Sequence, residues 1–212
     1  ATSLTMLERF SLPELERLLG QGRHLPDEIQ QVFGSLLYKI CRFQRLPEST
    51  RKLMAGWTIS DNTNKRNVAI NILAETGQEA DFELFHGIAL NDAEPENCSA
   101  AQDAIRKLFL LHPDAFQSRL GQGDFSPHPP LMEWLKELSP PAGTQETWMA
   151  ALLAARKKSA PKERPGLAST ITSWTLRWPD ALALAASRLE APEPVDLVCF
   201  LGGLENAAAS RL

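Results

Sequence analysis

The sequence has few cysteines, a single tyrosine and no long apolar run. Its three cysteines, Cys41, Cys98 and Cys199, are far apart and form no C-x-x-C motif, which argues against a disulfide framework and against a zinc site. No apolar run approaches the ~20 residues of a membrane-spanning helix, and the N-terminal ATSLTMLERF lacks the basic-then-apolar order of a signal peptide. If the sequence is complete, we therefore expect a reduced, cytosolic protein without metal, cofactor or membrane partner.

The chain also lacks an excess of positive charge. Its formal net charge is −4, so it offers no long-range attraction for nucleic-acid phosphates or an anionic membrane. Hydrophobic residues make up 43% of the sequence and charged residues 23%, as is usual for globular proteins that bury a core of their own. Abundant alanine and leucine, with the single tyrosine, favour a bacterial source.

Apolar residues recur with the period of a helix along most of the chain. In the clearest segment, six apolar residues share one helix face: Ile29, Val32, Phe33, Leu36, Leu37 and Ile40. A proline followed by an acidic residue opens this segment at Pro26 and recurs at Pro13 and Pro47, as is typical of helix starts. We expect an all-α fold of about ten short helices, packed as antiparallel pairs in an irregular bundle or a degenerate HEAT-like array.

Other residues mark where individual helices begin and end. Gly77 is placed to end a helix in the left-handed conformation, and Ser99 with Gln102 forms a capping-box pattern that predicts a helix start. His86 shares an apolar stripe with two phenylalanines. This position predicts a packed core histidine, with a ligand-binding or pH-sensitive group as the alternative.

The segment GQGDFSPHPP is rich in glycine and proline, which excludes a continuous helix. We therefore predict a loop or linker at 122–130. It separates an N-terminal helical region at 1–121 from a C-terminal helical region at 131–212, and the two regions can also form one continuous domain.

One short motif contains a possible catalytic pair. In RKLFLLH, the order of Arg106 and His112 resembles the motif of helical ribonucleases of the HEPN class over seven residues. The resemblance implies that the histidine acts as acid or base and that the arginine stabilises charge on a phosphate. An ideal helix puts the two side chains roughly 120° apart, and Pro113 marks the histidine as the end of a helix. A helix terminus is therefore the alternative interpretation.

The strongest local charge lies in RKKSAPKERP. This basic cluster consists of Arg156, Lys157, Lys158, Lys162 and Arg164. It could contact an acidic protein or nucleic acid. Alternatively, its first residues complement the dipole at the C-terminal end of a helix and the rest is a solvated loop.

Tryptophans lie on several of the predicted apolar stripes. Trp134, Trp148, Trp174 and Trp178 either fill the core or anchor a partner. Because the sequence has no phosphate loop, dinucleotide turn or nucleophile elbow, we expect a non-enzymatic interaction module, such as an adaptor, a regulator or a subunit of a larger assembly. It would bind another protein through these tryptophans and the basic cluster. The alternatives are a HEPN-like ribonuclease or nucleotide-processing domain and a nucleic-acid binder using residues 156–164.

Overall fold

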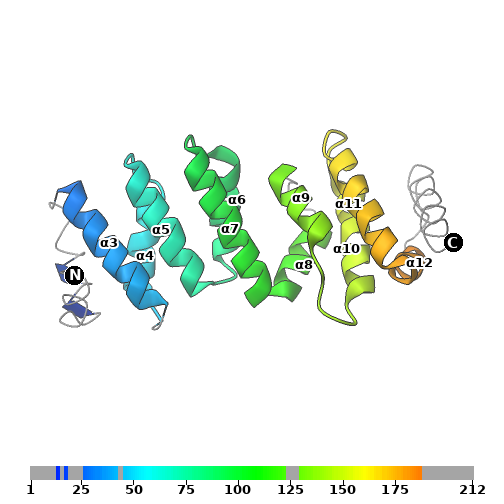
Figure 1. The fold of residues 1–212 in the computed structure, drawn as a ribbon, viewed down its shortest axis with the longest axis horizontal. Helices are drawn as coiled ribbons and strands as arrows, with labels where there is room; N and C mark the ends of the chain where they lie inside the picture. Colours follow the sequence, from blue (N-terminus) through cyan, green and yellow to red (C-terminus); the bar gives the residue numbers. More distant parts are fainter. Residues whose placement is uncertain (1–12, 15–16, 19–25, 43–44, 123–128, 188–212) are drawn as a thin grey trace. The chain divides into compact units, whose positions relative to one another are not determined.

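The structure is a computed structural model that describes residues 13–14, 17–18, 26–42, 45–122 and 129–187. All regular structure in these residues is helical, and ten of their helices, α3 to α12, follow one another through short connections (Figure 1). The expected all-α class is confirmed. None of the helices described is long and apolar enough to cross a membrane. The chain divides into two compact units, Ala1–His112 and Pro113–Leu212.

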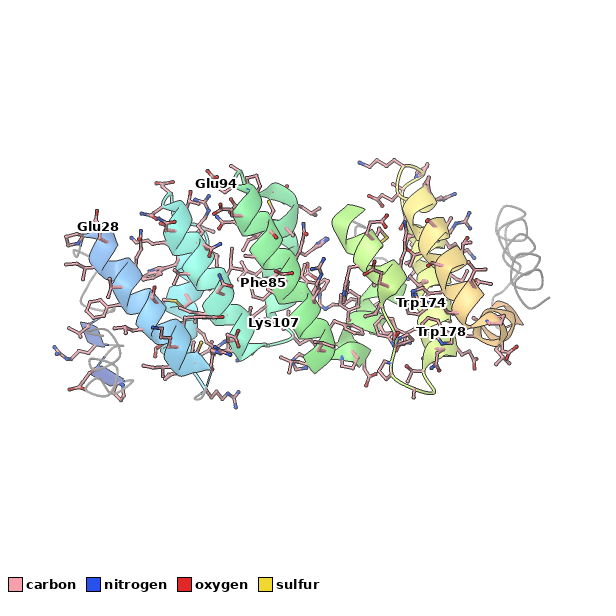
Figure 2. The ribbon with its side chains drawn as sticks, viewed as in Figure 1. Glu28, Phe85, Glu94, Lys107, Trp174 and Trp178 are labelled. Atoms are coloured by element: carbon pink, nitrogen blue, oxygen red, sulfur yellow. The ribbon has the colours of Figure 1, made fainter. Side chains whose placement is uncertain are left out.

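The described part of the first unit contains α3 (Asp27–Cys41), α4 (Glu48–Trp57), α5 (Thr63–Thr76), α6 (Asp81–Asn91) and α7 (Pro95–Leu111). Helices α3, α5 and α7 lie side by side, with α4 packed on α5 and α6 packed on α7 (Figure 1). Figure 2 shows Glu28 and Glu94, at the starts of α3 and α7, on one edge of this unit, and Lys107 towards the opposite edge. Helices α3 and α7 therefore end at the same edge.

Two of the predicted features of this unit are confirmed. Gly77 ends α5 with a φ of 45°, a conformation that glycine adopts without steric cost. A Cβ atom at this position would also collide with the end of the Leu111 side chain of α7, which would have to shift. His86 is buried and stacks on Phe82 with ring centroids 5.9 Å apart.

The predicted start of α7 is wrong. The helix begins at Pro95, one turn before the capping-box pattern, and Ser99 lies exposed within it. Proline is favoured in the first helical turn because its fixed φ suits the helix and its missing N–H is not needed there. The proline thus outweighs the polar pattern that follows it.

The described part of the second unit contains α8 (Pro113–Gln122), α9 (Pro129–Glu137), α10 (Gln145–Lys158), α11 (Arg164–Arg177) and α12 (Pro179–Ser187). Helix α10 packs against α8, α11 and α12, and α11 also packs against α9.

Aromatic side chains join these helices in the core. Phe116 of α8 stacks on Trp148 of α10, and Trp148 lies 6.2 Å from Trp174 of α11, measured between ring centroids. Figure 2 shows Trp174 beside Trp178, whose ring lies 5.2 Å away. The indole N–H of Trp174 donates to the carbonyl of Leu135 in α9 at 2.7 Å. A buried indole commonly needs such a partner.

The division between the two units falls before α8. This helix packs on α10, and the ammonium group of Lys158 donates to the carbonyls of Gly121 and Gln122, both at 2.9 Å. The last helix of the predicted N-terminal region therefore packs within the second unit. Most of the predicted linker, residues 123–128, lies outside the described residues.

Candidate functional site

A hollow of about 570 Å³ lies in the first unit at the edge where α3, α5 and α7 end. Its lining comes from the end of α3 and the following connection (41–42 and 45–46), from Arg51 of α4, from the end of α5 and the next turn (75–79), and from His112 after α7. A volume of this size lies within the range of about 300–1,000 Å³ found for ligand pockets. We call this recess the first-unit hollow.

A buried ion pair fixes one part of the first-unit hollow. Arg51 donates to both carboxylate oxygens of Asp81, at 2.7 and 2.5 Å, and also to the hydroxyl of Thr76. The main-chain N–H of Gln78 donates to the same carboxylate at 3.1 Å. These bonds tie α4 to the turn between α5 and α6. The side chains of Arg51 and Asp81 are only 7% and 12% exposed, so water screens the ion pair little.

A second set of contacts holds the ends of α3, α5 and α7. The ammonium group of Lys107 donates to Glu75 at 2.5 Å, and the hydroxyl of Tyr38 donates to the same oxygen at 3.3 Å. The hydrogen bond from Lys107 is the main reason why the pKa of Glu75 lies below its usual value. Burial, reinforced by the charge of Glu75, raises the pKa of Cys41 to about 11. The Cys41 thiol is therefore protonated near neutral pH and is a poor nucleophile.

Two arginines of the hollow differ from Arg51, which is held in a buried ion pair. Arg42 and Arg45 are exposed, and within the described residues neither side chain forms a hydrogen bond or a close ion pair. By contrast, Arg66 donates to both carboxylate oxygens of Asp92, at 2.9 and 3.0 Å. Arg177 donates to three carbonyls at the end of α9. These paired arginines hold helices together. Arg42 and Arg45 have no such hydrogen-bonded partner among the described residues, although the charge of Arg42 acts on Glu75.

The structure gives Arg106 and His112 different partners. Arg106 forms an exposed ion pair with Asp103 at 2.8 Å, one turn earlier in the same helix. The Nε2 atom of His112 lies 2.8 Å from the carbonyl oxygen of Gly77. The histidine lines the first-unit hollow and the arginine does not. His112 therefore occupies the helix end that the sequence offered as the alternative to a catalytic pair.

The basic cluster is divided between packing and solvent. Arg156 is buried, Lys158 donates to two carbonyls at the end of α8, and Arg164 donates to the carbonyl that follows α10 at 3.2 Å. Lys157 and Lys162 are exposed. Three of the five cations therefore contribute to the second unit itself, which leaves a smaller charged surface than the sequence predicted.

The tryptophans are divided in the same way. Trp148 and Trp174 have no exposed surface, so they serve as core residues and have no face to offer a partner. Trp134 and Trp178 are partly exposed. The guanidinium of Arg177 lies 4.4 Å from the ring centroid of Trp178, which is cation–π geometry.

The three arginines of the first-unit hollow were missed by sequence reasoning. Arg42, Arg45 and Arg51 come from the end of α3, the next connection and α4. Their spacing matches no motif, because packing and not sequence order brings them to the same recess. Only the recurrence of arginine around the end of α3 could have drawn attention to them.

No protein-family model, curated protein or solved structure matches the chain. Among the residues that the structure describes, no group of three or more His, Cys, Asp or Glu side chains is placed to hold a metal ion. The function is therefore inferred from the residues of the first-unit hollow.

Proposed function

We propose that the chain is a non-enzymatic helical interaction module that binds a protein partner at the first-unit hollow, as an adaptor, a regulator or a subunit of a larger assembly. The observation that carries the proposal is the pair of exposed guanidinium groups, Arg42 and Arg45, which have no hydrogen-bonded partner among the described residues. They line a recess whose Arg51 and Glu75 are held by ion pairs. The free thiols of Cys41 and Cys98 fit a reducing cytosol.

Binding is favoured over catalysis by the chemistry of the hollow. Its thiol is protonated near neutral pH, its histidine is bonded to a main-chain carbonyl, and Glu75 is paired with Lys107. A nucleophile activated by an adjacent base is the usual requirement of covalent catalysis. These groups instead line a recess beside the exposed Arg42 and Arg45, an arrangement suited to binding.

A nucleic-acid partner is less favoured. In the basic cluster, Lys158 and Arg164 donate to carbonyls and Arg156 is buried. The exposed Lys157 and Lys162 are a small footprint compared with the several phosphate contacts of a typical binder. A protein partner at the first-unit hollow is therefore the better proposal.

Selection from a displayed library of random peptides tests the proposal. We expect the full chain to enrich peptides whose affinity falls about tenfold or more in R42Q/R45Q. The matched variant K157Q/K162Q removes the same charge from exposed lysines elsewhere and should bind these peptides normally. The proposal is overturned if no peptide is enriched, or if enriched peptides bind all three proteins equally. Cleavage of a fluorogenic RNA that is lost in H112A would favour the ribonuclease alternative.

A further inference from the structure

The charges of the first-unit hollow leave it with a positive excess. Its lining contains three arginines and two glutamates. Arg51 is paired with Asp81, and Glu75 is paired with Lys107. Arg42 also acts on Glu75 through its charge, and Glu79 adds an exposed carboxylate. Even so, Arg42, Arg45, Arg51 and Lys107 outnumber the carboxylates of Glu75, Glu79 and Asp81.

Guanidinium groups recognise carboxylates through a planar fork of N–H donors. In the same unit, Arg66 makes this contact with Asp92, donating from Nε and Nη2 to the two carboxylate oxygens. Arg51 instead holds both oxygens of Asp81 through Nη2 alone. Resting on the proposed function, we infer that Arg42 and Arg45 bind the carboxylates of an acidic peptide segment of the partner, seated in the first-unit hollow.

The size and remaining chemistry of the hollow favour a peptide over a small anion. A space of about 570 Å³ is far larger than a phosphate ion needs and too small for a folded domain. The carboxylate of Glu79 can accept hydrogen bonds from the main-chain N–H groups of a peptide. Leu46 and Cys41 add an apolar part to the lining.

Fluorescence anisotropy of a short labelled poly-glutamate peptide tests this inference, with poly-glutamine as the neutral control. We expect the full chain to bind poly-glutamate and not poly-glutamine, with an affinity that falls as salt rises because exposed charges are screened. The dissociation constant should rise about tenfold or more in R42Q/R45Q and stay within about twofold in K157Q/K162Q. Both arginines are exposed, so R42Q/R45Q should keep the unfolding temperature of the unmodified chain.

Three results would overturn the inference. The first is failure of poly-glutamate to bind, and the second is equal binding by R42Q/R45Q. The third is displacement of the peptide by inorganic phosphate at similar concentration, which would indicate a small-anion site. If poly-glutamate fails while library peptides still depend on Arg42 and Arg45, the acidic preference is wrong and partner binding stands. If both fail, the proposed function is wrong as well.

Discussion

The Nε2 atom of His112 lies 2.8 Å from the main-chain carbonyl oxygen of Gly77. Because a carbonyl oxygen only accepts, this hydrogen bond requires a proton on Nε2. The imidazole thereby connects the end of α7 to the end of α5, where Gly77 has its left-handed conformation. The histidine of the RKLFLLH motif is thus part of the wall of the first-unit hollow.

Replacing His112 with alanine should lower the free energy of unfolding by about 0.5–1.5 kcal/mol, the usual net value of a hydrogen bond. Urea denaturation measures this change. Leu110 lies in the last turn of α7 and is 76% exposed, so L110A is a suitable control and should have little effect. Equal stability of H112A and the unmodified chain would contradict the structural role.

Replacing Arg51 with alanine should cost far more stability. The substitution leaves the carboxylate of Asp81 buried without its cation, and breaking a buried ion pair in this way costs about 3–5 kcal/mol. The matched control is R106A, because the Arg106–Asp103 pair is exposed, at 40% and 62% for the two side chains. Such a pair contributes only about 0–1 kcal/mol. Urea midpoints that shift equally in both variants would refute the proposed role of Arg51.

The helices were predictable because their signals are local. Periodic apolar residues and a proline start predicted α3, and Gly77 predicted the end of α5. The same periodicity could not predict which apolar residues of a helix are buried against a neighbouring helix. Val32 lies on the predicted apolar face of α3 and is 59% exposed, whereas Leu37 is fully buried. That difference depends on where α5 packs against α3, which the residues of α3 do not encode.

The candidate site was much harder to predict, because its residues gain their roles from distant partners. Lys158 looked like part of a binding surface, but its ammonium group caps a helix that ends 36 residues earlier. Arg42 and Arg45 carried no motif, and nothing in the sequence separates them from Arg51, which is buried and bonded to Asp81 and Thr76. Whether a charged side chain binds a partner or the chain itself is decided by long-range packing.

Stability should fall in acid partly through Glu75. Its pKa is lower in the folded chain than the ordinary value of 4.5. At a pH between these two values, Glu75 therefore binds a proton more readily in the unfolded chain than in the folded one. The stabilisation is complete above the ordinary pKa and is lost as the pH drops through the lower, folded value. Urea denaturation between neutral and strongly acidic pH should therefore give a flatter stability curve for E75Q. Parallel curves for E75Q and the unmodified chain would exclude this contribution.

Replacing Trp174 with phenylalanine distinguishes a core residue from a partner contact. The change removes the indole donor to the Leu135 carbonyl and leaves a gap at a position with no exposed surface. We expect the free energy of unfolding to fall by about 1–3 kcal/mol. The control W178F acts on a partly exposed ring and should cost less. Peptides selected on the first-unit hollow should bind W174F with unchanged affinity under conditions where it is folded. If W174F is as stable as the unmodified chain but loses these peptides, Trp174 is a contact residue and its assignment to the core is wrong.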